Sequence, residues 1–122
     1  MNEYMNISKV AELTGVSPHT LRYYERAGLY EPVPKDAGGR RLYRPSDLEW
    51  IEILKVLRGT GMPVSRIREL IRLANEGEST RRKRIAFYQA YQRELEQQIQ
   101  MRSAAILTIE KKILKHQRLL KD

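Results

Sequence analysis

The chain has 122 residues, of which 31% are charged; its formal net charge is +8 and it contains no cysteine. This length allows one core of ordinary size, or a smaller domain followed by an extended element. The lack of cysteine excludes disulfides, thiolate metal sites and thiol redox sensing. Because no long apolar run is present, we expect no membrane span and no secretory signal, and therefore a cytoplasmic protein.

The positive charge is concentrated in the C-terminal part of the chain. Residues 1–77 contain 12 basic and 10 acidic side chains, whereas residues 78–122 contain 11 basic and five acidic ones. A polyanionic partner and a merely solvated helix face both fit this balance. The case for nucleic acid therefore depends on local patterns.

The first 26 residues predict two short helices joined by a tight turn. The first helix is expected to follow Ser8 as its N-cap and to reach about residue 14, with Leu13 among the residues available for burial. Gly15 suits the left-handed position that ends a helix. Ser17 is expected to cap the second helix, and Pro18 fits its first position because proline has no N–H to satisfy there. This arrangement predicts a helix-turn-helix motif.

One face of the second helix gathers side chains that suit a DNA groove. At 100° per residue, the apolar residues Leu21 and Tyr24 fall on the opposite side of this helix. The four side chains on the polar face are His19, Arg22, Tyr23 and Arg26. Arginine can donate two hydrogen bonds to a guanine edge or bind phosphate, and a tyrosine hydroxyl can donate to phosphate. An ordinary solvated face is the alternative, and we favour the recognition helix of a DNA-binding motif.

A small β-hairpin is expected after the second helix. Two prolines in "LYEPVPKDAGG" exclude a helix, and the segments Leu29–Glu31 and Arg41–Tyr43 flank an Asp-Ala-Gly-Gly turn. Basic and aromatic side chains follow the glycines, namely Arg40, Arg41, Tyr43 and Arg44. Such side chains on a thin loop can straddle a DNA backbone, so the hairpin is interpreted as a wing.

Two further helices come after the hairpin. Ser46 and Glu49 have the spacing of a capping box, which predicts the start of a third helix that "GTGMP" ends. A fourth helix is expected from about Val64 to Ala74, and Gly77 closes it.

Residues 78–122 contain neither proline nor glycine. Nothing in this segment breaks a helix, so it predicts one long helix. With Ile85 at heptad position a, eight of the eleven a and d positions are apolar, while Gln92, Arg102 and His116 are polar. The expected dimerisation residues are Ile85, Tyr88, Leu95, Ile99, Ile106, Ile109 and Ile113. A helix of about 60 Å is longer than the diameter of the small domain before it, so that domain cannot cover its apolar stripe. We therefore expect a homodimer, whose helices could pair parallel or antiparallel.

The segment "STRRKR" places four basic side chains near the expected start of this helix. Cations there oppose the helix dipole, so the favoured interpretation is a helix that begins later, after a solvated hinge. The alternative is that Arg81, Arg82 and Lys83 contact DNA phosphates or an acidic partner.

These patterns together resemble the MerR family of bacterial transcription regulators. The resemblance covers "ISKVAELTGVSPHTLRYYERAGLYEP", "GGRRLYRPSDLEWI", "LRGTGMPVSRIREL" and the long helix. It implies a mainly α fold: a winged helix-turn-helix domain over residues 1–77, with a small β-hairpin wing and a second helix pair as an additional wing. Residues 78–122 would form the dimerisation helix of an antiparallel coiled coil.

The resemblance also implies which residues meet DNA and how the protein would act on it. It assigns contacts to Ser17, His19, Thr20, Arg22 and Tyr23, to Arg41 and Tyr43 of the wing, and to Arg58 with the Gly61–Val64 loop. The dimer would bind a pseudo-palindrome in double-stranded promoter DNA, distort it, and act on RNA polymerase through the shared promoter. We expect no metal, no cofactor and no C-terminal effector domain, which leaves the effector unknown.

Other classes of function fit less well. An architectural or excisionase-like accessory protein would share the winged domain but would not need the rod. A coiled-coil scaffold that binds an acidic protein would leave the polar face of the second helix unexplained. An enzyme is not expected, because no phosphate loop, no cysteine and no paired carboxylates of a cleft are present.

Overall fold

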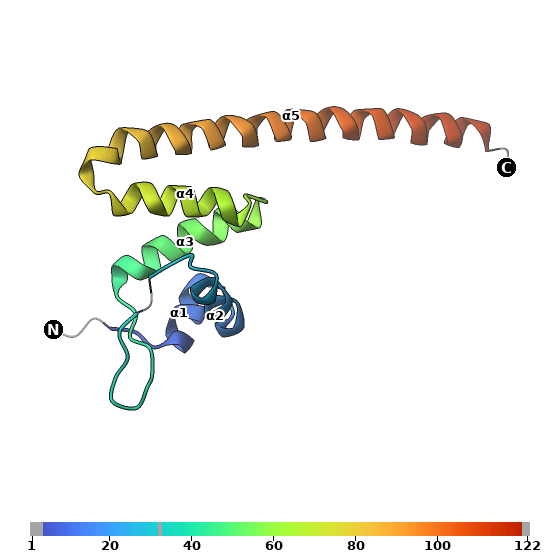
Figure 1. Ribbon diagram of the computed structural model, residues 1–122. Coiled ribbons are helices and arrows are strands. Elements are labelled where there is room, and N and C mark those ends of the chain that lie inside the picture. The colour runs from blue at the N-terminus through green and yellow to red at the C-terminus, as the bar shows by residue number, and fades with distance from the viewer. Residues whose placement is uncertain (1–3, 32, 121–122) are drawn as a thin grey trace. The chain divides into compact units, whose positions relative to one another are not determined.

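The computed structural model describes residues 4–31 and 33–120, which form two compact units that divide between Glu78 and Ser79 (Figure 1). The first unit contains helices α1 (Ile7–Thr14), α2 (Pro18–Arg26), α3 (Pro45–Gly59) and α4 (Val64–Asn75). A short 3-10 turn, η1 (Glu78–Thr80), leads into helix α5 (Arg81–Leu119). Pro32 and the outer ends of both predicted domains, residues 1–3 and 121–122, lie outside the described residues.

Helix α1 begins earlier than the sequence predicts. The side chain of Asn6 accepts a hydrogen bond from the backbone N–H of Lys9 at 2.8 Å, so Asn6 is the N-cap. Ser8 lies within the helix. The expectation that Leu13 is buried is also wrong, because its side chain is 49% exposed.

The turn between α1 and α2 forms as predicted. Gly15 adopts a φ of +75°, and its N–H donates to the carbonyl of Ala11 at 2.9 Å. The Ser17 hydroxyl accepts the backbone N–H of Thr20 at 3.1 Å, and Pro18 occupies the first turn of α2. These caps satisfy backbone groups that a helix end leaves without partners.

The N-terminus of α3 is capped by a different pair from the predicted one. Asp47 accepts the backbone N–H of Arg44 at 2.9 Å and also accepts from its guanidinium at 3.2 Å. Ser46 lies inside the first turn of α3, so the predicted box of Ser46 and Glu49 is wrong. Helix α4 begins at Val64 as expected, directly after Pro63.

The core of the first unit lies where α1 packs against α2 and α3. Its side chains come from every helix of this unit and from the connections that follow α2 and α3. The fully buried apolar residues include Val10, Leu21, Leu29, Ile51, Leu54 and Ile67. Burying each such side chain stabilises the fold by about 1.5–3 kcal/mol.

The segment 33–43, here called the 33–43 loop, turns back on itself without forming a strand among the described residues (Figure 1). One isolated antiparallel β-bridge joins Lys35 to Arg41, and another joins Tyr43 to Met5. The predicted pairing of Leu29–Glu31 with Arg41–Tyr43 is therefore wrong. The partner of Tyr43 comes from the segment before α1, where Met5 exchanges two backbone hydrogen bonds of 2.8 Å with it.

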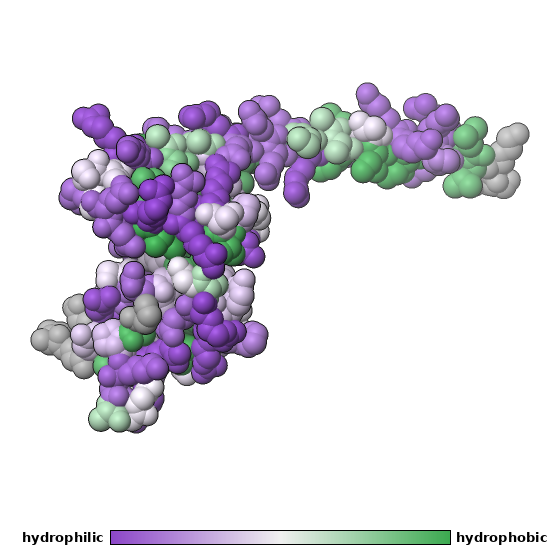
Figure 2. All heavy atoms as spheres, in the orientation of Figure 1, coloured by the Kyte–Doolittle hydropathy of each residue, from purple (hydrophilic) through white to green (hydrophobic). Residues whose placement is uncertain are grey.

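Helix α5 is continuous over 39 residues and begins at Arg81. The favoured interpretation of a solvated hinge is thus wrong, because the basic residues form the first turn of the helix. The side chain of Arg84 donates to the hydroxyl of Thr80 at 3.2 Å in that turn. From residue 96 to residue 120 every side chain is exposed, and hydrophobic residues reach the surface along this half (Figure 2).

Candidate nucleic-acid interface

The outer face of α2 carries the four side chains that the sequence places there. His19, Arg22 and Tyr23 lie on it together with Arg26, and solvent reaches this face of the helix. On the other side of the helix, Leu21 is fully buried and Tyr24 is 7% exposed, and these two residues fix the rotation of α2. The outer face therefore offers guanidinium, imidazole and phenol groups, the donors that read base edges and phosphates.

Ser17 and Thr20 have a structural role at the start of α2. Beside its cap bond, the Ser17 hydroxyl donates to the Thr20 hydroxyl at 3.0 Å. Both hydroxyls thus already have partners within the turn, and a contact with DNA would add to this network.

The tip of the 33–43 loop presents Arg40 to the solvent. One carboxylate oxygen of Asp36, Oδ1, accepts the backbone N–H groups of Gly38 and Arg40, both at 2.9 Å. The backbone N–H of Asp36 donates to the carbonyl of Arg40 at 2.8 Å. The side chain of Arg40 is 81% exposed, with its Nε 3.6 Å from Asp36. Such a loosely held guanidinium can turn toward an anion.

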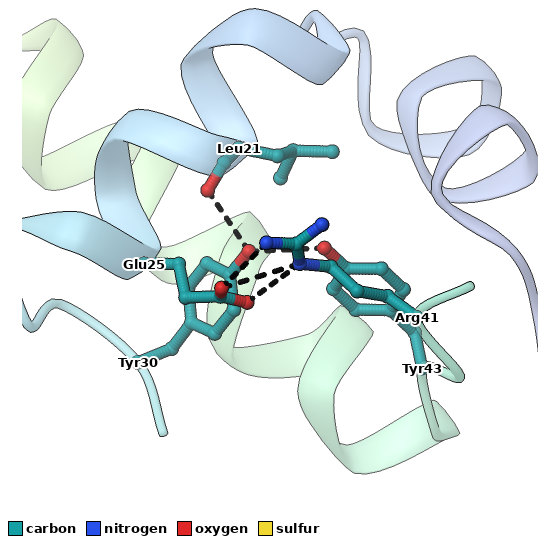
Figure 3. A network of polar contacts seen from close by, with 5 residues as sticks. All are labelled: Leu21, Glu25, Tyr30, Arg41 and Tyr43. Carbon is teal, nitrogen blue, oxygen red and sulfur yellow. Dashed lines mark hydrogen bonds and ion pairs between the residues drawn. The ribbon is translucent and has the colours of Figure 1, made fainter. Parts of the chain in front are cut away.

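Arg41 points back toward α2. Its Nε and Nη2 donate to the two carboxylate oxygens of Glu25 at 3.0 and 2.9 Å (Figure 3). The two side chains are only 25% and 15% exposed. The hydrogen bond to Glu25 raises the pKa of Arg41 above its ordinary value. This side-on, bidentate geometry is the strongest form of a protein ion pair.

Tyr43, for which the resemblance implies a contact with DNA, lies in the core of this structure. Its side chain is 0% exposed, and its hydroxyl lies 3.0 Å from that of Tyr30 (Figure 3). Tyr30 donates its one hydroxyl hydrogen to the carbonyl of Leu21 at 2.9 Å. Tyr43 is therefore the donor in the contact between the two hydroxyls. Burial raises the pKa of both tyrosines above the ordinary value.

Arg44 and Arg58 also have partners within the protein. Arg44 is exposed but holds Asp47 at the start of α3. The Nη1 of Arg58 donates to the carbonyl of Met62 at 2.8 Å, which braces the connection from α3 to α4. Either side chain would exchange or share these partners when it meets a phosphate.

The start of α2 and the end of α3 enclose an open hollow of about 540 Å³. Lys55 and Arg58 supply two cations to its lining, and Tyr23 supplies a phenol. The Lys55 ammonium also donates to the carbonyl of Thr14 at 2.7 Å, at the end of α1. This group of donors suits an anion such as a backbone phosphate.

Lys55 and Glu25 are the residues that sequence reasoning missed. Lys55 lies 41 positions from its partner Thr14, and Glu25 lies 16 positions from Arg41. Neither contact leaves a local pattern in the sequence. Helical spacing places Glu25 beside the face of α2, but it does not show that a loop residue folds back to meet it.

The described residues hold neither a candidate metal cluster nor a membrane-spanning helix. Over 4–31 and 33–120, no group of three histidine, aspartate or glutamate side chains could hold a metal ion. Among the helices described, none combines the length and apolarity that crossing a bilayer requires.

Residues 5–74 match the family described as "MerR HTH family regulatory protein". The chain is 42% identical over 76 residues to the HTH-type transcriptional regulator AdhR of Bacillus subtilis (strain 168). That match covers 62% of this chain and 54% of AdhR. The chain thus spans about half the length of the curated relatives it matches.

Solved structures resemble the chain over more of its length. HiNmlR, described as a MerR family regulator lacking the sensor domain and bound to promoter DNA, has a TM-score of 0.80 at 28% identity. It covers 94% of this chain, and 91% of its own chain is matched. A MerR family regulator from Bacillus thuringiensis also has a TM-score of 0.80 at 28% identity, over 92% of this chain and 98% of its own. The expected mainly α fold with a long C-terminal helix is confirmed, while the β-hairpin wing stays a prediction.

Proposed function

The chain belongs to the MerR family of helix-turn-helix regulatory proteins, and we propose that it is a homodimeric transcription regulator that binds promoter DNA. Membership of a family of regulators confirms the expectation that the chain is not an enzyme. The proposed DNA partner would place the protein in the cytoplasm, on the bacterial chromosome. The description of HiNmlR as bound to promoter DNA supports this partner.

The observation that carries the proposal is the outer face of α2. Two buried anchors, Leu21 and Tyr24, hold the helix in a compact unit, and its opposite face presents His19, Arg22, Tyr23 and Arg26. A helix held in this way can enter a major groove and use its side chains for base edges and phosphates. Arg40 at the tip of the 33–43 loop would add a contact with the neighbouring backbone.

The exposed apolar residues of α5 support a dimer. Ile99, Ile106, Ile109 and Ile113 follow the heptad spacing and are between 50% and 64% exposed on the single chain. A helix of 39 residues is about 58 Å long, and a second α5 laid along it would cover this stripe. With antiparallel pairing, as the family resemblance implies, the rod would hold two DNA-binding units at a set separation. Such a dimer recognises a pseudo-palindrome.

The same architecture suits control through the shape of the promoter. Bending a site of 20–30 base pairs costs on the order of 1–6 kcal/mol, so a modest change in the separation of two bound units can alter the duplex. In this proposal RNA polymerase responds to the distorted promoter without any contact to the protein. In this proposal the dimer has two conformations that differ in the separation of its DNA-binding units, and an effector would act by binding one of them more tightly than the other.

The decisive experiment is a selection of genomic DNA fragments by the purified chain, followed by affinity measurements on the enriched site. We expect an inverted repeat with half-sites about one helical turn apart. The Arg22→Ala variant should bind this site at least tenfold more weakly, since a good base contact contributes about 1–3 kcal/mol and the dimer loses one such contact from each chain. Arg93→Ala, which removes the same charge from the exposed surface of α5, serves as the control and should bind almost normally.

Two further measurements address the dimer and the distortion. Sedimentation of the wild-type chain at micromolar concentration should give twice the mass of one chain. Energy transfer between dyes at the two ends of the enriched site should rise when the protein binds and bends it. A monomer that binds one asymmetric site would favour the architectural or excisionase-like alternative and would overturn the proposal.

A further inference from the structure

Glu25 and Arg41 join the 33–43 loop to the helix that carries the proposed DNA-reading face. Glu25 lies on α2, one residue before Arg26, while Arg41 follows the exposed Arg40 directly. Both nitrogens that face the carboxylate donate to it, at 3.0 and 2.9 Å (Figure 3). The pair thus links the two proposed DNA-facing segments directly.

The pair is the outer part of a larger connection between the same two elements. Two residues after Arg41, the buried Tyr43 reaches the hydroxyl of Tyr30, which in turn donates to the backbone carbonyl of Leu21 on α2. The backbone of Tyr43 is fixed on its other side by Met5. The base of the loop is therefore held to α2 by one ion pair at the surface and one chain of hydrogen bonds in the core.

We propose that Glu25 and Arg41 are positioning residues, whose ion pair sets the place of Arg40 relative to α2, and that Arg41 does not itself neutralise a DNA phosphate. This inference rests on the proposed function, because it concerns how the DNA-binding surface is shaped. It departs from the family resemblance, which assigns to Arg41 a contact with the DNA backbone.

The cost of breaking the pair argues for this assignment. If Arg41 turned to a phosphate, the Glu25 carboxylate, only 15% exposed, would lose its bidentate partner and stand beside a polyanion. Arg40 carries no such cost. Its guanidinium is 81% exposed and its contact with Asp36 is long, at 3.6 Å. Of these two neighbouring arginines, Arg40 is available to the DNA and Arg41 is committed to α2.

The Glu25→Gln variant separates the two roles by the sign of its effect. An amide has one acceptor oxygen, so the variant loses the bidentate pair without losing any positive charge. If the pair positions the loop, affinity for the enriched site falls, by on the order of tenfold. If Arg41 instead contacts a phosphate, the variant frees Arg41 and removes a negative charge, so affinity rises. A rise would overturn the proposal.

Variants of Arg41 add a test based on salt. Arg41→Lys keeps the charge but cannot form two parallel hydrogen bonds, and we expect it to bind nearly as weakly as Arg41→Met. In both, the slope of log affinity against log salt should equal that of the wild type. In Arg40→Gln the slope should fall by about 1.8, the value for two lost phosphate contacts, one from each chain of the dimer. Wild-type affinity in Arg41→Lys, a reduced slope in Arg41→Met, or an unchanged slope in Arg40→Gln would contradict the proposal.

Amide hydrogen exchange of the free protein tests the same claim without DNA. In Glu25→Gln the loop amides of Asp36 and Leu42, which donate to Arg40 and Pro34, should exchange severalfold faster, while the α1 amides keep their wild-type rates. Unchanged loop exchange would overturn the positioning role. If the wild type bound no DNA, the proposed function would fail, while the exchange rates would still decide whether the pair holds the loop.

Discussion

The hydroxyl oxygens of Tyr30 and Tyr43 lie 3.0 Å apart inside the core, in a chain that ends on the backbone of α2. We expect Tyr30→Phe to lower the free energy of unfolding by about 1–3 kcal/mol, because it leaves the Leu21 carbonyl and the Tyr43 hydroxyl without their partner. Tyr23→Phe is the control, since Tyr23 is 41% exposed, and should change stability by less than about 0.5 kcal/mol. Urea unfolding measures both. Equal effects of the two variants would show that the buried hydrogen bonds of Tyr30 contribute nothing to the free energy of unfolding.

The same tyrosines predict how stability depends on alkaline pH. Burial raises the pKa of Tyr30 and Tyr43 in the folded protein, whereas in the unfolded chain both ionise near pH 10. Their contribution is therefore fully present below pH 10 and is lost as pH rises above it, because the unfolded state then releases protons that the folded state retains. The double variant Tyr30→Phe, Tyr43→Phe should lose less stability between about pH 9 and pH 11. A loss equal to that of the wild type would contradict this assignment.

The cap of α3 offers a comparison between neighbouring residues. Asp47→Ala should lower the free energy of unfolding by about 1 kcal/mol, because the backbone N–H and the guanidinium of Arg44 both lose their acceptor. Ser46→Ala should change it by less than about 0.5 kcal/mol, since Ser46 lies inside the helix. Thermal or urea unfolding measures both variants. A larger loss of stability in Ser46→Ala than in Asp47→Ala would show that Ser46 is the cap.

The turn of the helix-turn-helix motif depends on the backbone of Gly15. With φ at +75°, an added Cβ is strained, and it would also lie 3.3 Å from the Lys55 ammonium. We expect Gly15→Ala to destabilise the first unit by about 1–2 kcal/mol. Gly59→Ala, at the end of α3 with nothing within 4 Å, should leave stability unchanged or raise it by as much as about 0.5 kcal/mol. Similar losses of stability at both positions would contradict the role assigned to the backbone of Gly15.

The dimer seam can be tested with two residues of equal exposure. Ile109 and Leu107 are both 59% exposed, but only Ile109 falls on the a and d positions of the heptad. Ile109→Glu should shift the sedimenting species from dimer to monomer at micromolar concentration, whereas Leu107→Glu should leave the mass unchanged. If Leu107→Glu dissociates the dimer and Ile109→Glu does not, the chains pair through another face.

Local signals in the sequence predicted most of the helices. Gly15, Ser17 and Pro18 each favour one backbone conformation, and the structure has each of them in the expected place. The long helix was predictable because nothing between residues 81 and 119 breaks it. The start of α3 was harder, since Ser46 and Asp47 are both good capping residues and the choice depends on where Arg44 lies.

The candidate site was predictable only where it lies on one helix. Helical spacing alone groups His19, Arg22, Tyr23 and Arg26. The 33–43 loop has no such period, so nothing in "GGRRLYR" distinguishes Arg40, which faces solvent, from Arg41, which folds back. That distinction comes from Glu25, a tertiary partner. Tyr43 was mistaken for a surface residue for the same reason, because its buried partner Tyr30 lies 13 residues away.

The carboxylate of Asp36 has a consequence for kinetics. By accepting the N–H groups of both Gly38 and Arg40, it keeps the end of the loop folded before any partner arrives. A partner thus meets a finished shape, and little conformational entropy is lost when the two engage. We therefore expect the association rate to follow diffusion and ionic strength, with no lag from a loop that must first find its conformation.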